Sequence, residues 1–357
     1  MTQQAAIDLD VEIMVLSADP TDPAVGAGAR HLEGDPSDLE ALRRLAQSCD
    51  VVSFEHELVP NEALVSLAEE FDSVRPSPAA KLLAQDKWHS RQALEEAGFP
   101  LPAFAHTTSS EEACAFAERH GWPVVLKAPT GGYDGRGVWF AADADAVAVA
   151  FGEADGPLLC EENVRIDSEL AAIAARRPSG EVRTYPVVET RQVDGICHEV
   201  ALPAKVDAGV AAQAVELVER IASRFEVEGL VCVELFNAGG ELLINELALR
   251  PHNSGHVTMD ACETSQFENF LRAILDLPLG DTRSLHPAAL MVNVLGPADG
   301  SDPRERLGQA LAIEGARVHL YGKEPRPGRK LGHVNAVGDD AESVAAAARR
   351  AANTLSP

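Results

Sequence analysis

The chain has 357 residues, which is more than a single hydrophobic core usually supports, so we expect two or three domains. A formal net charge of −26 argues against a nucleic-acid partner, because a protein needs a basic face to bind the phosphates of nucleic acid. No apolar run reaches transmembrane length, residues 1–10 lack the features of a secretory signal, and the six cysteines have no metal or disulfide spacing. These observations predict a cytoplasmic protein with reduced thiols and no membrane partner.

The N-terminal residues predict strands that alternate with helices. Residues 1–10 have the pattern of the second half of a helix, and a strand at 11–17, a helix near 36–49 and a strand at 50–55 follow. This alternation is typical of a parallel sheet. Such a unit normally opens with a strand and a glycine-rich turn before its first helix, so we expect this N-terminal sheet to lack its first strand.

A small α+β unit is predicted next. Residues 78–99 have a helical pattern and lead through Pro100-Leu-Pro102 to a helix near 109–120. The unit itself runs from 123 to 163, with a strand at 123–127, a glycine-rich turn, a strand at 137–142, a helix at 144–153 and a strand at 157–161. The prolines mark a boundary, which allows this unit to move separately.

The turn between the first two of these strands carries four glycines, with Asp134 and Arg136, shortly after Lys127. Glycine lets backbone N–H groups approach a polyphosphate closely, and a lysine at a strand end adds a positive charge for the same oxygens. An ordinary glycine-rich turn is the alternative interpretation. We predict a loop that covers phosphates.

The second half of the chain predicts strands over 168–203, a helix at 208–225, a hairpin at 229–247, strands at 288–295, 317–321 and 331–337, and an alanine-rich terminal helix. The hairpin holds acidic residues within apolar strands. A loop at 238–240 would pair residue 234 with residue 244 and place Glu246 diagonally beside Glu234. Converging carboxylates favour a bound cation, so the pattern predicts Mg²⁺ with ATP phosphates, and solvated edge glutamates are the alternative.

Two polar loops complete the candidate site. After the hairpin, Arg250 suits an anionic substrate or intermediate, and His252 and Asn253 could orient it, although a capped structural loop is also consistent. His252 and His256 have the spacing of a helical metal pair, but the Asn-Ser-Gly between them disfavours a helix. Residues 323–333 hold four cations against one anion in an acidic chain, which predicts a phosphate site, with a solvated face as the alternative.

Three motifs in order, GGYDGRG at 131–137, INELALRPHNSGH at 244–256 and RPGRKLGH at 326–333, resemble the 5-(carboxyamino)imidazole ribonucleotide synthases, ATP-grasp ligases of purine biosynthesis. QDK at 85–87, ADPTDPA at 18–24 and FEHE at 54–57 extend the resemblance over almost the whole chain. It implies an ATP-grasp fold of α/β and α+β type. The implied domains are a truncated N-terminal α/β domain at 1–90, a lid at 91–164, a core at 165–285 and a C-terminal domain at 286–357.

The resemblance also implies a reaction and a set of site residues. ATP, bicarbonate and 5-aminoimidazole ribonucleotide would give the carboxyamino product, ADP and phosphate through carboxyphosphate, with Mg²⁺, in a homodimer. The implied catalytic residues are Arg250, His252, Asn253, Asp134 and Lys323, and the metal ligands are Glu234 and Glu246. The nucleotide would contact Lys87, Lys127, Gly132, Tyr133, Asp134, Gly135, Arg136, Gly137, Val138, Glu161, Glu162, Asn163, Val164, Glu169, Gln192, Asn245 and Glu246, with Glu161–Val164 gripping adenine and Glu169 the ribose. The ribonucleotide would contact Tyr133, Asp134, Arg136, Glu57, Lys323, Arg329 and Lys330.

The sequence departs from this family at three places. The opening strand and its GGGQLG-type turn are absent, so we hypothesise that translation begins upstream of Met1 or that this form is poorly stable. An intact mass of the native protein that matches a start at Met1 would contradict the upstream start. Leu249 stands where the family usually has proline, and Gln192 where some relatives carry histidine; both changes look tolerable.

Two other functions fit parts of the pattern. A different ATP-grasp carboxylase, or a formate-using transformylase, would differ in the 323–333 loop and at Tyr133-Asp134. A truncated, non-catalytic nucleotide-binding protein is the second alternative. The glutamates of the hairpin and Arg250 argue against it, since an abandoned site has no reason to keep them together.

Overall fold

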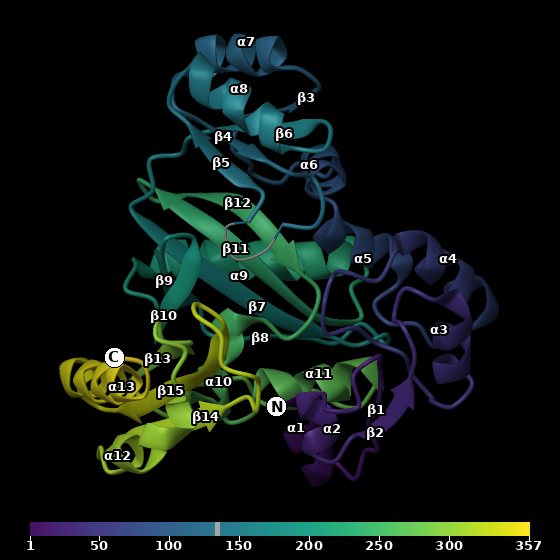
Figure 1. The fold of residues 1–357 in the computed structure, drawn as a ribbon, viewed down its shortest axis with the longest axis vertical. Coiled ribbons are helices and arrows are strands. Elements are labelled where there is room, and N and C mark those ends of the chain that lie inside the picture. The colour runs from purple at the N-terminus through teal and green to yellow at the C-terminus, as the bar shows by residue number, and fades with distance from the viewer. Residues whose placement is uncertain (133–135) are drawn as a thin grey trace.

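The computed structural model describes residues 1–132 and 136–357, so the expectations for Tyr133, Asp134 and Gly135 lie outside the described residues. The lid stands above a large central sheet, and the N-terminal and C-terminal units lie side by side beneath it (Figure 1). No helix in these two ranges is long and apolar enough to cross a membrane.

The N-terminal unit contains a parallel sheet, as predicted, but its second strand, β2, was not predicted. Its elements are α1 (Thr2–Asp8), β1 (Met14–Ser17), α2 (Pro23–Gly26), β2 (Arg30–Glu33), α3 (Leu39–Ala46) and α4 (Asn61–Glu70), and β1 pairs in parallel with β2. The strand expected at 50–55 was wrong: Val52 makes only one parallel bridge, to Val74. Among the described residues, no strand lies between β1 and the segment around Val52 and pairs with both of them.

Two helices connect this unit to the lid. The helix expected over 78–99 is divided into α5 (Pro78–Gln85) and α6 (Lys87–Glu96), because Asp86 has extended backbone angles. The Asp86 carboxylate accepts the His89 N–H at 2.9 Å and so caps α6. The break places Lys87 in the first turn of α6, beside the central sheet.

The lid contains the small α+β unit that the sequence predicts, together with one strand that was not predicted, β3. Its sheet has the order β3 (Phe104–Thr107), β6 (Leu158–Glu162), β4 (Val124–Lys127), β5 (Val138–Ala141), and α7 (Ser110–His120) and α8 (Ala144–Glu153) cover it. Lys127 pairs with Val138, so the glycine-rich turn lies at the tip of the β4–β5 hairpin, as predicted. A Cβ on Gly132 would come within 2.7 Å of the Arg136 carbonyl oxygen, which explains glycine there.

The central sheet runs through the rest of the described chain in the order β12-β11-β7-β9-β10-β13-β15-β14, with β8 on β7. Its strands are β7 (Ser168–Arg176), β8 (Val182–Thr184), β9 (Val188–Val193), β10 (Ile196–Leu202), β11 (Gly229–Ala238), β12 (Glu241–Ala248), β13 (Ala288–Leu295), β14 (Ala316–Leu320) and β15 (Lys330–Gly338). The antiparallel β10–β13 pair continues the sheet into the C-terminal unit. There α13 (Ala341–Leu355) packs on β13 and β15, with α12 (Leu307–Leu311) beside it.

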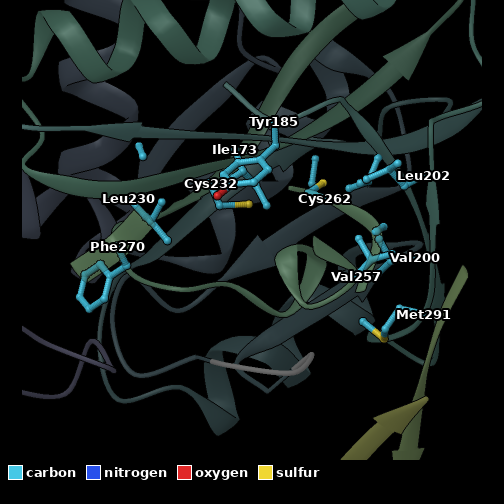
Figure 2. Close-up of a cluster of buried hydrophobic side chains, with 14 of the residues drawn as sticks. Ile173, Tyr185, Val200, Leu202, Leu230, Cys232, Val257, Cys262, Phe270 and Met291 are labelled. Atoms are coloured by element: carbon cyan, nitrogen blue, oxygen red, sulfur yellow. The ribbon is translucent and has the colours of Figure 1, made fainter. Parts of the chain in front are cut away.

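Both faces of the central sheet are buried. Along β7, Leu170, Ala172 and Ala174 pack with α9 (Ala208–Arg224), whereas Ala171 and Ile173 pack with α11 (Gln266–Ile274) on the other face. Figure 2 shows the second cluster, in which Tyr185 and Cys232 lie among aliphatic side chains. This alternation follows the two-residue period of a strand and makes the sheet a rigid base for the site.

Candidate active site

One cavity of about 2690 Å³ lies between the lid, the central sheet and the N-terminal unit. Except for Gly137, it is lined by every described residue that the sequence predicted for the site: Glu57, Lys87, Lys127, Gly132, Arg136, Val138, Glu161, Glu162, Asn163, Val164, Glu169, Gln192, Glu234, Asn245, Glu246, Arg250, His252, Asn253, Lys323, Arg329 and Lys330. Residues that are up to 273 positions apart, from Glu57 to Lys330, therefore face one space.

The β11–β12 hairpin brings the two carboxylates together, but not in the register that the sequence predicted. Gly239 and Gly240 both have positive φ, 65° and 91°, so they form a two-residue turn in which Ala238 pairs with Glu241. The predicted pairing of residues 234 and 244 was therefore wrong. A register shift at Asn245 then places Glu234 directly opposite Glu246.

The two carboxyl groups of the hairpin have different surroundings, which shift their pKa values in opposite directions. Burial, followed by the negative charges of Glu246 and Glu169, raises the pKa of Glu234 to about 8. Burial also pushes the pKa of Glu246 upward, but the ammonium groups of Lys87 and Lys127 outweigh it and hold that pKa below its usual value. The Lys87 Nζ lies 3.3 Å from Glu246 Oε2. Glu234 thus has an excess of negative charge around it, which a cation would relieve.

A buried ion network lies on the lid side of the hairpin. Lys127 Nζ is 2.6 Å from Glu161 Oε2 and donates to Asn245 Oδ1 at 3.0 Å. Arg91 of α6 donates to the other Glu161 oxygen and, at 2.6 Å, to the Asn245 carbonyl. Burial opposes the ionised form of Glu161, yet Lys127 and Arg91 keep its pKa below its usual value. Sequence reasoning missed Arg91, because its helix carries no motif that indicates a partner 70 positions away.

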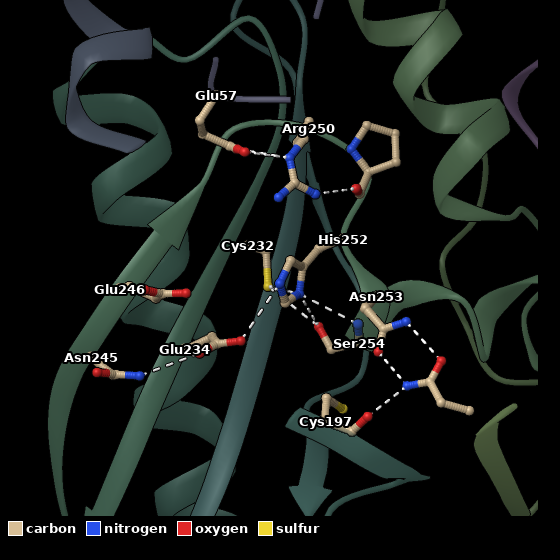
Figure 3. A network of polar contacts seen from close by, with 12 residues as sticks. Glu57, Cys197, Cys232, Glu234, Asn245, Glu246, Arg250, His252, Asn253 and Ser254 are labelled. Carbon is tan, nitrogen blue, oxygen red and sulfur yellow. Dashed lines mark hydrogen bonds and ion pairs between the residues drawn. The ribbon is translucent and has the colours of Figure 1, made fainter. Parts of the chain in front are cut away.

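The Asn253 side chain is fixed at the base of the cavity. Its amide exchanges two hydrogen bonds with the Asn293 amide, at 3.0 and 2.7 Å, and Asn293 also donates to the Cys197 carbonyl at 2.8 Å (Figure 3). The η1 turn (Asn253–Gly255) is a single 3₁₀ turn, so His252 and His256 do not form a helical pair. Among the described residues no group of three or more His, Cys, Asp or Glu side chains is arranged to hold a metal ion.

His252 presents one ring nitrogen to the carboxylates. Its Nδ1 receives the Ser254 backbone N–H at 3.4 Å and lies 2.8 Å from Ser254 Oγ and 3.3 Å from Cys232 Sγ (Figure 3). A backbone N–H can only donate, so Nδ1 is an acceptor and the neutral ring carries its proton on Nε2, 3.5 Å from Glu234 Oε1. Burial, then the charges of Arg250 and Lys330, lowers the pKa of His252 to about 3. The neutral ring therefore offers an N–H donor to the cavity.

Arg250 is held by a residue of the N-terminal unit. Its Nε donates to both Glu57 carboxylate oxygens, at 2.7 and 2.9 Å, and its Nη1 donates to the Pro251 carbonyl at 3.1 Å (Figure 3). The side chain is partly buried and lines the cavity. This arrangement fixes the plane of the guanidinium beside His252.

The comparisons with known proteins cover the whole chain. Family models described as Ribonucleotide synthetase preATP-grasp domain, ATP-grasp domain and Phosphoribosylaminoimidazole carboxylase C-terminal domain match residues 1–85, 92–267 and 289–347. The N5-carboxyaminoimidazole ribonucleotide synthase of Mycobacterium tuberculosis (strain ATCC 25618 / H37Rv) is 46% identical over 367 residues, covering 100% of this chain and 85% of the relative. The chain belongs to the N5-carboxyaminoimidazole ribonucleotide synthase family. The resemblance seen in its three motifs is confirmed.

Solved structures of N5-carboxyaminoimidazole ribonucleotide synthases have the same fold. The Aspergillus clavatus enzyme in complex with ADP and 5-aminoimidazole ribonucleotide gives a TM-score of 0.92 at 32% identity, covering 99% of this chain and 95% of that one. The Thermotoga maritima enzyme gives 0.88 at 34% identity, covering 99% and 94%. The fold is a mixed α/β ATP-grasp fold with a preATP-grasp domain, as predicted.

Residues 323–333, the cationic loop of this synthase family member, border the cavity on the side of the C-terminal unit. Lys323, Arg329 and Lys330 line the cavity, and Lys323 Nζ lies 5.2 Å from the centroid of the Tyr321 ring. The Tyr321 hydroxyl is 2.8 Å from His333 Nδ1, and this contact restrains the Tyr321 ring. Positive charge from the last third of the chain thus faces the carboxylates of the hairpin.

Proposed function

We propose that the chain catalyses the ATP-dependent carboxylation of 5-aminoimidazole ribonucleotide by bicarbonate, through carboxyphosphate, in purine biosynthesis. The observation that carries this proposal is the single cavity lined by Lys127, Glu246, Arg250 and Lys323, in a chain that belongs to the synthase family. The products are 5-carboxyamino-1-(5-phosphoribosyl)imidazole, ADP and phosphate.

The nucleotide half of the cavity lies between the lid and the hairpin. Lys87 and Lys127 line this half and would supply two ammonium groups for the phosphate oxygens, and the glycine-rich turn between β4 and β5 would cover those oxygens with backbone N–H groups. Asn163 and Val164 follow β6 and line the cavity, and they would contact adenine. The Glu161 side chain is engaged with Lys127 and Arg91, so its contribution there is to orient Lys127. Glu169 is half-buried. Burial raises the pKa of its carboxyl, and the hydrogen bond with Gln192 acts in the opposite direction.

The donor set fits Mg²⁺. Glu234 and Glu246 are directly opposed, and the amide of Asn245, the residue before Glu246, donates to Glu234 at 3.3 Å. Burial and then the charge of Glu246 raise the pKa of Glu234, and a bound cation would offset both effects. Mg²⁺ commonly takes one or two protein carboxylates together with substrate phosphates, so a larger protein cluster is unnecessary. When bound, Mg²⁺ neutralises phosphate charge during phosphoryl transfer.

Bicarbonate would be activated beside Arg250 and His252. Bicarbonate is a poor electrophile until phosphorylated, and carboxyphosphate survives only where water is excluded. The Arg250 fork and the His252 Nε2–H are fixed donors for the oxygens on which charge develops, while Asn253 lies alongside. Closure of the lid over the cavity would exclude water.

The enzyme itself needs no covalent nucleophile in this reaction. Burial raises the pKa of both Cys160 and Cys262 to about 12, and burial also raises the pKa of Cys232, the cysteine next to His252. These thiols are therefore protonated at neutral pH. Catalysis then depends on positioning and charge neutralisation.

The ribonucleotide phosphate would bind at the cationic loop. We expect Lys323→Ala to raise the KM for 5-aminoimidazole ribonucleotide about tenfold or more, because one charge-assisted phosphate contact is lost, while the KM for ATP stays within about twofold. Steady-state kinetics with each substrate varied in turn measures both constants. Lys205→Ala, on an exposed loop away from the cavity, is the control. An ATP defect of equal size would contradict the assignment.

The test of the proposed function is a reconstituted assay with ATP, Mg²⁺, bicarbonate and 5-aminoimidazole ribonucleotide. We expect ADP release that depends on the ribonucleotide and equals its consumption. Replacement of bicarbonate by formate distinguishes the transformylase alternative, which would then turn over. ATP binding without turnover under any of these conditions would favour the non-catalytic alternative. We propose further that the enzyme acts in the cytoplasm as a homodimer. Light scattering of the purified protein tests the dimer.

A further inference from the structure

Lys81 of α5 is fully buried, with 0% of its surface exposed, and none of the steps above uses it. A buried ammonium costs free energy unless charge and hydrogen bonds compensate it. Its partners therefore indicate why a lysine occupies this position.

Lys81 holds the segment that carries Glu57. Its Nζ donates to the His56 carbonyl at 2.8 Å, lies 4.0 Å from Glu57 Oε1 and lies 5.7 Å from the centroid of the Phe54 ring. Gln85, one helical turn further along α5, donates through Nε2 to the Glu57 carbonyl at 2.8 Å and to the Val59 carbonyl. One face of α5 thus holds the backbone at His56 and Glu57 by hydrogen bonds, and the Lys81 ammonium attracts the Glu57 carboxylate across 4.0 Å.

The contacts continue from Glu57 into the cavity. Both Glu57 oxygens accept from Arg250 Nε, at 2.7 and 2.9 Å, and Figure 3 shows this pair above the His252 ring. The Lys81 ammonium attracts the same Glu57 oxygen, Oε1, that accepts from Arg250 at 2.7 Å, and this attraction favours one orientation of the carboxylate. The orientation of Arg250 therefore depends on a helix that does not itself reach the reacting groups.

The charges around Lys81 agree with this arrangement. Burial lowers the pKa of Lys81 to about 8, with the Glu57 charge opposing that shift and the Arg250 charge adding to it. His56, the other titratable neighbour, has its pKa lowered by burial and then by the Lys81 charge, so its ring is neutral at pH 7. Lys81 is cationic at neutral pH at a cost in stability.

We propose that Lys81 is a positioning residue, which orients the Arg250 guanidinium for its anion by fixing the Glu57 carboxylate. This inference rests on the proposed function, in which Arg250 contacts bicarbonate or carboxyphosphate. A purely structural role for Lys81 predicts a different result, because removal of the side chain would then lower stability without a selective effect on turnover.

The decisive variant is Lys81→Met, which keeps the length of the side chain and removes its charge. We expect kcat to fall about tenfold, since a misplaced catalytic group loses near-attack geometry, and the KM for ATP to stay within about twofold. The melting temperature should stay within about 4 °C of the original, because the desolvation cost of the ammonium is removed together with its hydrogen bond to the His56 carbonyl. Lys205→Met is the exposed control and should leave kcat and melting temperature unchanged. A kcat within about twofold of the original, or lost activity with a fall in melting temperature of more than about 4 °C, overturns the proposal.

A double-mutant cycle tests the route through Glu57. In a Glu57→Gln background, Lys81→Met should change kcat by less than about twofold, whereas independent effects would multiply and overturn the route. A crystal structure of Lys81→Met gives a readout that does not depend on the reaction. We expect the Glu57 contact to Arg250 Nε to be lost, and its retention at 2.7 to 2.9 Å overturns the proposal. Absence of carboxylation by the original enzyme would instead refute the proposed function and leave this structural test intact.

Discussion

Arg250→Lys is expected to lower kcat about 10²–10³-fold, because the variant loses a fixed planar donor at the point where negative charge develops. A lysine could still supply a positive charge. It could not keep the arrangement in which Nε binds Glu57 and Nη1 binds the Pro251 carbonyl while the side chain lines the cavity. The KM for ATP should change by less than about threefold, since Lys87 and Lys127, which lie toward the lid, serve the phosphates.

Steady-state kinetics with each substrate varied in turn checks this result. Arg224→Lys is the matched control, because Arg224 is exposed near the end of α9 and is not among the residues that line the cavity. If Arg250→Lys kept kcat within about threefold, or raised the KM for ATP as much as it lowered kcat, Arg250 would not be the anion-binding residue.

The two amide variants of His252 are expected to differ. In His252→Gln the amide NH₂ reaches about as far as Nε2, and in His252→Asn about as far as Nδ1. Because the structure places the proton on Nε2, toward Glu234, Gln retains a donor where the reaction needs it. We expect kcat to fall about tenfold for Gln and about 10²–10³-fold for Asn.

The assigned tautomer can also be measured directly. Selective ¹⁵N labelling of the 11 histidines, with His252 assigned by its loss in His252→Gln, should show a protonated Nε2 and a bare Nδ1 at neutral pH. Equal losses for the Gln and Asn variants, or a ring protonated on Nδ1, would refute the role of Nε2–H as donor. A melting temperature within about 3 °C of the original for both variants confirms that the comparison is not one of folding.

The hairpin shows how far the sequence could be interpreted. Acidic residues between apolar neighbours predicted that Glu234 and Glu246 converge, and they do. Their register could not be predicted, because it depends on a two-residue turn at Gly239-Gly240 and on a shift at Asn245 that the strand pattern does not show. The shift is what makes the two carboxylates directly opposed instead of diagonal.

The residues that sequence reasoning missed share a physical reason. Arg91 and Lys81 lie on helices whose patterns are those of ordinary helices, and their partners are distant in the chain. Similarly, residues 50–55 are apolar enough for a strand, but a strand needs neighbours, and Val52 has only a single bridge. Motifs with glycine, proline and charge at fixed spacing could be recognised; contacts that exist only after folding could not.

The most direct test of the central claim is the fate of bicarbonate oxygen. With ¹⁸O-labelled bicarbonate, ATP, Mg²⁺ and 5-aminoimidazole ribonucleotide, formation of carboxyphosphate in the cavity predicts transfer of one ¹⁸O atom into each inorganic phosphate released. ATP hydrolysis that proceeds without the ribonucleotide and leaves the phosphate unlabelled would contradict the account.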